Sequence, residues 1–171
     1  MFGKRVACTI NPSLAEENED TISEAEVKKN VLVIGGGPAG MEAAYVARKR
    51  GHHVVLCEAN DELGGMLRIA AVPIAKQDLT QVIKYMIRKL AISGVEVRKN
   101  CTVTKEMLEK EFHGYEIIAA NGAKPIVINA FTNFKQWMTA DDILAGKAFP
   151  GRKVVIIGGG SVGCETADYL A

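Results

Sequence analysis

The sequence predicts an α/β fold in which a parallel β-sheet is flanked by helices. Two observations carry this prediction. From Val31 onward, strand-like and helix-like patterns alternate along the chain, which is typical of βαβ units. The strand-like runs are also continuously apolar, as in NVLVIG at 30–35 and KVVIIGG at 153–159, which is expected of strands buried on both faces.

The composition fits one ordinary globular domain. The chain has 171 residues, 48% of them hydrophobic and 24% charged, with a formal net charge of +1. That length suits one well-buried domain and is short for two. A nearly neutral chain without a basic, aromatic-rich face argues against nucleic-acid binding. No apolar run approaches the roughly 20 residues that cross a bilayer, and the N-terminus makes a poor signal peptide, so we expect a cytoplasmic protein with no membrane partner.

The first elements follow one another in the order strand, helix, strand. After a polar, acidic linker at 13–30, the strand at 30–35 leads into an alanine-rich helix that begins at Pro38 and stops at Gly51. HHVVLCEA at 52–59 is the second strand. Residues at helical spacing in the helix are Met41, Ala44, Tyr45 and Arg48.

The second half of the chain contains one long helix and several shorter elements. The helix is predicted at 78–94, with an apolar face formed by Val82, Ile83, Met86, Ile87 and Leu90. Short strands are predicted at 95–100 and 102–104, and a strong one begins YEIIAA at 115–120. Between 125 and 149 we expect a surface crossover, with Asp141 and Asp142 at a helix N-terminus, before the last strand at 153–159.

The turn after the first strand has the glycine spacing of a dinucleotide-binding site. Gly35 permits the tight turn, Gly37 lets the backbone approach a pyrophosphate, and Gly40 lets the helix pack against the strand. The N-terminus of the helix favours phosphate charge. Glu58 ends the second strand, where a carboxylate can accept both hydroxyls of an adenosine ribose. The alternative is a purely structural glycine turn with an exposed Glu58.

A second glycine pair follows in DELGGMLR. Gly64 and Gly65 again permit close backbone approach, beside the loop after the second strand. Arg68 is either a phosphate ligand or a solvated surface residue. Together with the first turn, this segment favours FAD over NAD, because an extended flavin nucleotide needs a second contact segment. The predicted fold is therefore a Rossmann-like FAD/NAD(P)-binding fold.

These motifs resemble a known family of flavoenzymes. CTINP, the first glycine turn with its flanks, AANGAKP and KVVIIGGGSVGCETA are similar to the C-terminal reductase part of the NADH:flavin oxidoreductases related to 2,4-dienoyl-CoA reductase, enoate reductase and trimethylamine dehydrogenase. The resemblance implies an N-terminal barrel with FMN, a [4Fe–4S] cluster and a FAD domain into which an NAD(P)H domain is inserted. It divides this chain into residues 1–30 beside the cluster, a FAD-binding part at 31–150 and the start of an NAD(P)H-binding part at 151–171.

The resemblance also implies site residues. The pyrophosphate contacts are Gly35, Gly37, Pro38, Ala39 and Gly40, the ribose contact is Glu58, and the path to the flavin is lined by Gly64, Gly65 and Met66. Gly122 and Ala123 lie beside the FAD, although Asn121 stands where threonine is usual. Some family members hold ADP in place of FAD, and the sequence leaves both open.

The four cysteines are scattered and contain no C-x-x-C pair. The resemblance makes Cys8 the last of four cysteine ligands to the [4Fe–4S] cluster, the other three lying upstream of Met1. One thiolate cannot hold a cluster that needs four, so we expect neither cluster nor FMN in this chain. Cys57, Cys101 and Cys164 are interpreted as reduced thiols packed as small hydrophobes.

The second glycine turn is expected to be unfinished. Gly158, Gly160 and Gly163 repeat the spacing of the first turn, but the sequence stops at Ala171, within the following helix. We expect no useful NAD(P)H binding by this chain alone. The strand at 153–157 is expected to pair with the edge of the FAD-type sheet or with the sheet of a second copy.

The leading functional expectation is a fragment of an NAD(P)H-dependent flavin oxidoreductase. In the intact enzyme, electrons pass from NAD(P)H through FAD, the cluster and FMN to a substrate such as an enoyl or dienoyl C=C bond. Catalysis belongs mainly to the cofactors, so no acid, base or nucleophile is assigned. The alternatives are a nucleotide-binding module without turnover and a piece of a glutamate-synthase-type reductase subunit. The expected partners are the nucleotide and the missing domains of the same polypeptide.

Overall fold

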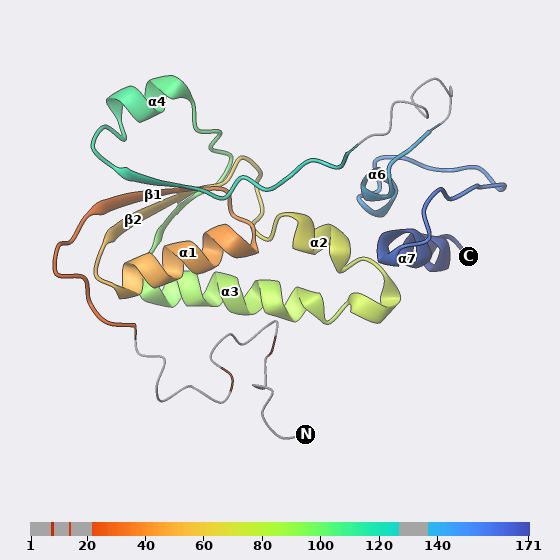
Figure 1. Cartoon of the computed structure of the whole chain (residues 1–171), viewed down its shortest axis with the longest axis horizontal. Coiled ribbons are helices and arrows are strands. Elements are labelled where there is room, and N and C mark those ends of the chain that lie inside the picture. The colour runs from red at the N-terminus through yellow and green to blue at the C-terminus, as the bar shows by residue number, and fades with distance from the viewer. Residues whose placement is uncertain (1–7, 9–13, 15–21, 127–136) are drawn as a thin grey trace.

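The computed structural model describes residues 8, 14, 22–126 and 137–171 of the chain. These residues form an α/β fold with one parallel sheet flanked by helices (Figure 1). The strands are β1 (Asn30–Ile34), β2 (His53–Cys57), β3 (Glu96–Arg98) and β4 (Glu116–Ala119). The helices are α1 (Pro38–Lys49), α2 (Met66–Ala70), the 3-10 helix η1 (Ile74–Lys76), α3 (Leu79–Ser93), α4 (Lys105–Lys110), α6 (Ala140–Leu144) and α7 (Ser161–Leu170). The predicted fold class is confirmed.

The sheet has the strand order β3-β2-β1-β4, and every neighbouring pair is parallel. Because β1 and β2 are the central strands, they have a neighbour on both sides and helices on both faces. This position explains their continuously apolar sequences, since both faces of each strand are buried. β4 is an edge strand, and all four of its residues are exposed.

Alternating residues of the central strands fill two separate core layers. Helices α1 and α3 cover one face of the sheet, and α4 covers the other (Figure 1). The larger layer joins the sheet to α1 and α3 through Val31, Val33, Met41, Ala44, Ala47, Val54, Leu56, Leu63, Leu90 and Val95. The smaller layer lies on the α4 side and contains Leu32, Val55, Cys57 and Phe112. The period of two along each strand therefore decides which helix each side chain meets.

Helix α1 begins where the glycine turn ends. Gly37 is its N-cap, with φ −72° and ψ 178°, and Pro38 occupies the first turn, where proline's missing N–H costs no helical hydrogen bond. Of the predicted inner face, Met41 and Ala44 are buried, and Tyr45 packs against the same layer from a partly buried position. Arg48 donates from Nε to the Ser93 carbonyl at 3.1 Å, which ties the end of α1 to the end of α3.

Helix α3 confirms the prediction for 78–94 with one difference. Ile83 and Leu90 are buried, and Gly94 ends the helix in the left-handed conformation at φ 74°. Ile87, however, is 37% exposed. The helix therefore turns a narrower apolar stripe toward the sheet than the sequence pattern predicted.

The strand predicted at 102–104 is wrong. Thr104 is instead the N-cap of α4, and its side-chain oxygen accepts a hydrogen bond from the Met107 N–H at 3.3 Å. The β-branched residues that favoured a strand also include a good helix-capping residue, and capping prevailed. Helix α4 itself was not anticipated. The helix start at Asp141 and Asp142 is confirmed, with Thr139 as the N-cap of α6.

The strand predicted at 153–157 is also absent. The segment forms no strand in the structure, and within the described residues β4 pairs only with β1, so the expected docking of this segment on the sheet edge is not observed. Val155 is 86% exposed and Ile157 66%. A strand needs a hydrogen-bonding neighbour, and an apolar sequence alone does not supply one. Helix α7 follows and packs near α6, away from the sheet (Figure 1).

Among the described residues, no helix combines the length and the apolar character needed to cross a bilayer.

Candidate nucleotide-binding site

The first glycine turn lies at the carboxyl edge of the sheet. The Gly35 N–H donates to the Cys57 carbonyl at 2.8 Å, and the Ala120 N–H donates to the Ile34 carbonyl at 2.8 Å, so the ends of β1, β2 and β4 meet there. From β1 the chain continues outward to β2 and β3 and then returns to β4 on the opposite side of β1. Ligands of open α/β sheets bind at the carboxyl edge where the strand order reverses in this way.

Two glycines of the turn are required by the fold itself, and a third is closely packed against a side chain. Gly35 has φ 110°, and a Cβ there would overlap the Ala120 carbonyl oxygen. A Cβ on Gly40 would overlap the Gly35 carbonyl oxygen, and one on Gly36 would overlap the Leu63 side chain. Gly35 and Gly40 hold the backbones of strand, helix and the segment after β4 together at distances that only glycine permits.

Gly37 differs from its neighbours. A Cβ at this position would meet nothing within 4 Å, and its φ of −72° is one that any residue adopts. The fold therefore does not need glycine here, and the space beside its backbone is open. An open cradle at the N-cap of a helix is what a pyrophosphate requires, so the residues present fit a dinucleotide.

Glu58 is buried, with 6% of its surface exposed, and not exposed as the structural alternative supposed. Its Oε2 accepts the Gly36 N–H at 2.6 Å. Its Oε1 accepts the Asn60 N–H at 2.8 Å and the Asn60 Nδ2 at 2.7 Å. The carboxylate therefore joins the glycine turn to the loop after β2, and these bonds fill three of its roughly four acceptor positions.

Two of these partners were missed from the sequence. Gly36 was not singled out from the sequence, yet its N–H is the donor to Glu58. Asn60 had one usable signal, because an Asn two residues after an Asp or Glu can bond back to it in a tight loop.

The second glycine pair is packed directly on the first turn. The Gly64 N–H donates to the Gly36 carbonyl at 2.8 Å, and a Cβ on Gly65 would lie 3.1 Å from the Gly37 Cα. Both glycines have positive φ, 120° and 51°. Met66, the first residue of α2, is 47% exposed. Arg68 forms an ion pair with Glu62, so its cation already has an acidic partner.

The remaining sequence candidates lie at different distances from the turn. Pro38 and Ala39 form the first turn of α1 beside Gly37. The segment after β4 meets the turn through Ala120 and Asn121, since a Cβ on Gly35 would lie 3.1 Å from the Asn121 Cα. Gly122 and Ala123 are exposed, and a Cβ on Gly122 would have no neighbour within 4 Å. The structure does not bring these two residues against the turn.

The second glycine turn repeats the geometry of the first. Gly158 has φ 116°, close to 110° at Gly35, and Gly160 caps α7 with φ −80° and ψ −179°. A Cβ on Gly163 would overlap the Gly158 carbonyl oxygen, just as Gly40 meets Gly35. The turn lacks the sheet, however, because residues 153–157 form no strand. The local sequence is therefore sufficient for the turn conformation. A binding site around the turn also needs neighbouring strands.

Cys8 belongs to the described part of the chain and is half-buried. Within the described residues, no three His, Cys, Asp or Glu side chains are grouped so that they could hold a metal ion.

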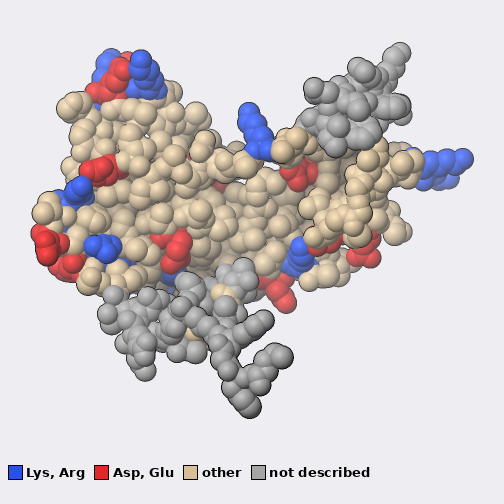
Figure 2. All heavy atoms as spheres, viewed as in Figure 1, with Lys and Arg blue, Asp and Glu red and all other residues tan. Residues whose placement is uncertain are grey.

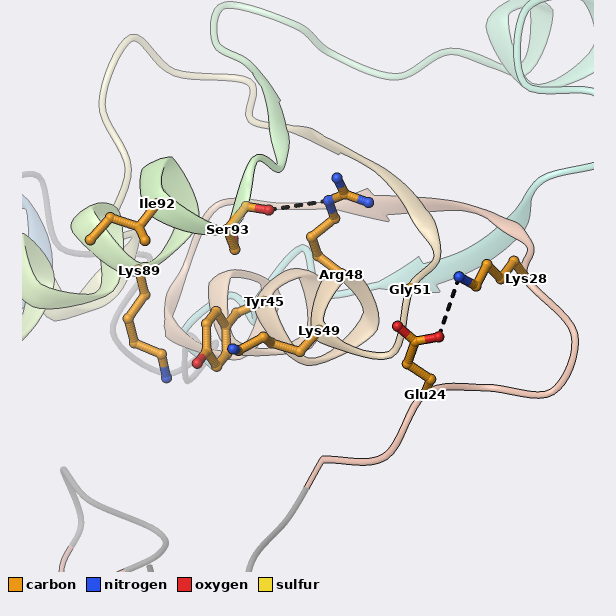
Figure 3. Close-up of a pocket in the computed structure, with 9 residues that line it drawn as sticks. All are labelled: Glu24, Lys28, Tyr45, Arg48, Lys49, Gly51, Lys89, Ile92 and Ser93. Atoms are coloured by element: carbon orange, nitrogen blue, oxygen red, sulfur yellow. Dashed lines mark hydrogen bonds and ion pairs between the residues drawn. The ribbon is translucent and has the colours of Figure 1, made fainter.

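One cavity lies away from the glycine turn. It measures about 630 Å³ and lies at the opposite ends of α1 and α3 (Figure 3). Two of its cations have acidic partners: Lys28 pairs with Glu24 at 3.3 Å, and Lys89 pairs with Glu42 at 2.9 Å. Acidic and basic side chains are also interspersed on the face shown in Figure 2. Neither feature competes with the glycine turn as the nucleotide site.

Comparison with known proteins agrees with this geometry. The family model described as pyridine nucleotide-disulphide oxidoreductase matches residues 29–171. The chain belongs to this family. Its FAD/NAD(P)-binding fold accounts for the parallel sheet and for the glycine turn at its edge.

Relatives that are similar to the chain include proteins of the flavin and enoate reductase type. Cinnamate reductase of Clostridium sporogenes is 42% identical over 165 residues, covering 96% of this chain and 24% of that protein. NADH oxidase of Thermoanaerobacter brockii is 42% identical over 178 residues, covering 98% and 26%. The solved complex of 2-naphthoyl-CoA reductase with 2-naphthoyl-CoA has a TM-score of 0.86 and 33% identity, over 96% of this chain and 25% of that one. The chain thus spans about a quarter of the length of these relatives.

Proposed function

We propose that the chain binds FAD, or ADP in its place, at the first glycine turn. The observation that carries this proposal is the contrast between Gly37 and its neighbours. Gly35 and Gly40 are required by backbone packing, whereas Gly37 leaves open space at the N-cap of α1. A glycine that the fold does not need is explained by a ligand that approaches the backbone there.

The residues around the turn have separable roles in this proposal. The pyrophosphate lies against Gly37, Pro38 and Ala39, where the helix N-terminus favours its negative charge. Gly64, Gly65 and Met66 border the path toward the flavin, and Gly122 and Ala123 lie farther along it.

Glu58 accepts the ribose hydroxyls. Because its carboxylate already accepts three hydrogen bonds, the ribose displaces or shares the two bonds from Asn60. The exposed Asn60 side chain can turn its Nδ2 away, whereas the N–H groups of Asn60 and Gly36 are held by the backbone. The bond from Gly36 therefore orients the carboxylate for the ribose.

In a longer protein of the relatives' kind, the chain is the FAD-binding part of an NAD(P)H-dependent oxidoreductase. Bound FAD supplies the ability to accept a hydride and release single electrons. The relatives' names support reduction of an activated C=C bond, such as that of an enoyl or dienoyl compound. In that setting Cys8 would be one ligand of a [4Fe–4S] cluster, which would supply single-electron transfer.

The chain by itself is a nucleotide-binding module without turnover. Gly158, Gly160 and Gly163 form the turn of an NAD(P)H site, but the segment before them pairs with no strand in the described residues. Without a sheet, the turn has no second strand to hold a ribose.

The substitution Gly37→Ala tests the proposal. The added Cβ meets no protein atom, so the chain keeps its circular dichroism spectrum, and loss of the glycine N-cap costs at most about 1 kcal/mol of unfolding free energy. The methyl group does occupy the space beside the pyrophosphate. We expect the dissociation constants of ADP and FAD, measured by titration calorimetry, to rise at least tenfold, or about 1.4 kcal/mol.

Gly151→Ala is the matched control, because a Cβ there also meets nothing within 4 Å and its φ is ordinary. It should bind ADP like the unsubstituted chain. Equal affinities for Gly37→Ala and Gly151→Ala would show that the nucleotide, if bound, does not lie at the first turn. NADH oxidation by the chain alone would contradict the module without turnover.

A further inference from the structure

We propose that Cys57 and Cys101 are a reversible dithiol–disulfide pair. Cys57 is the last residue of β2, and Cys101 lies just after β3, in the loop that leads to α4. The sequence shows no C-x-x-C motif, and the two residues meet only because β2 and β3 are neighbours in the sheet.

The backbone places the two residues side by side. The Glu58 N–H donates to the Arg98 carbonyl at 2.9 Å, the Cys101 N–H donates to the Glu58 carbonyl at 2.8 Å, and the Asn100 N–H donates to the Asn60 carbonyl at 2.9 Å. Segments joined in this way run roughly 5 Å apart, as paired strands do. Cys57 itself pairs with Arg98 in the β2–β3 ladder, and Cys101 bonds to Glu58, the residue that follows Cys57, so the two cysteines are near neighbours.

The side chains share one layer of the core. Cys57 is 1% exposed and packs with Leu32, Val55 and Phe112, and Cys101 packs against the same cluster. Burial, followed by a hydrogen bond with Cys101, raises the pKa of Cys57 to about 12. The two thiols therefore lie in the same core layer while both are reduced.

The unequal exposure of the two thiols sets the order of reaction. Cys101 is half-buried, so it meets a low-molecular-weight disulfide first. Its thiolate attacks one sulfur of that disulfide, the S–S bond breaks, and one small thiolate leaves. Cys57 then gives up its proton to the second leaving thiolate and bonds to the Cys101 sulfur, releasing the second small thiol. The two cysteine sulfurs are oxidised, and the small disulfide is reduced to two thiols.

The pair is independent of the proposed nucleotide site, although it borders Glu58. Cys164 offers an internal comparison, because it is exposed and lies in α7 on a different part of the molecule. Cys164 should react with the same disulfide. Its adduct should persist, because Cys164 does not lie beside β2 and β3, where Cys57 and Cys101 are neighbours.

The experiment treats the reduced full chain with oxidised glutathione, blocks remaining thiols with an alkylating reagent and maps the unreduced digest by mass spectrometry. We expect a peptide pair linked through Cys57 and Cys101 that dithiothreitol separates. Cys101→Ser should abolish the linked pair, Cys57→Ala should leave glutathione on Cys101, and Cys164→Ser should retain the linked pair.

Two outcomes would overturn the inference. One is a glutathione adduct that stays on Cys101 in the unsubstituted chain with no linked peptide. The other is a linked pair that joins Cys101 to Cys164 or Cys8 in place of Cys57. The Cys57→Ala adduct keeps the test decisive even if Cys101→Ser folds poorly.

Discussion

At the residue scale, the glycines of the first turn divide into two kinds that the sequence motif alone does not distinguish. Gly35 and Gly40 are fixed by backbone atoms that a Cβ would overlap, so they belong to the fold. A Cβ on Gly37 would point into open space, so this glycine belongs to the proposed ligand. Glu58 is of a third kind, since its buried carboxylate serves the fold through Gly36 while facing the proposed ribose site.

The substitution Gly40→Ala tests this division. Its Cβ would overlap the Gly35 carbonyl oxygen, so helix α1 must move away from β1. We expect the free energy of unfolding to fall by about 3 kcal/mol in urea titrations, the upper part of the range for overpacked sites. In the same titration, the Gly37→Ala variant should lose at most about 1 kcal/mol of unfolding free energy. Equal losses in the two variants would contradict the division.

At the element scale, the positions of the helices depend on the residues at their ends as much as on their apolar faces. Gly37 and Pro38 begin α1, Gly94 ends α3, and the sequence predicted these features because each residue is unusual at its position. Thr104 was misread because threonine suits both a strand and an N-cap. Phe112, just after α4, shows why the helix is present, since it fills the core layer on that face of the sheet.

The substitution Thr104→Ala measures the contribution of this cap. The Met107 N–H loses its side-chain acceptor, and we expect the chain to lose about 1 kcal/mol of unfolding free energy. Thr102→Ala is the matched control, because Thr102 is exposed and lies before the helix. Its effect should stay within about 0.5 kcal/mol. A loss at Thr102 as large as that at Thr104 would mean that 102–104 contributes as an extended segment.

At the scale of the whole molecule, the chain has a layered sheet and a smaller helical part. Both core layers share β1 and β2, so loosening either one exposes the same strands. Helices α6 and α7 contact each other, and Lys76 of η1 pairs with Glu165 of α7 at 2.6 Å. The apolar residues of 154–157 add little to this packing because they are exposed.

Amide hydrogen exchange followed by mass spectrometry should separate these two parts. Amides of β1 and β2 should exchange only when the sheet unfolds, at least roughly a thousandfold more slowly than those of 154–157. Amides of α7 should exchange at intermediate rates, because the helix is hydrogen-bonded but packs on few neighbours. Protection at 154–157 equal to that of β1 would show that this segment pairs as a strand in solution, as its sequence predicted.

The sequence by itself determined the α/β class, the two glycine turns and the acid at Glu58, because these depend on local geometry and on the burial of single strands. Only the tertiary structure distinguished one turn from the other. Gly35 lies among the ends of three strands, whereas Gly158 has the same backbone conformation without a sheet beside it. Strand order likewise brings Cys57 to Cys101 and Gly36 to Glu58. Hydrogen bonds between strands join residues far apart in the chain, and no local pattern records which strands will be neighbours.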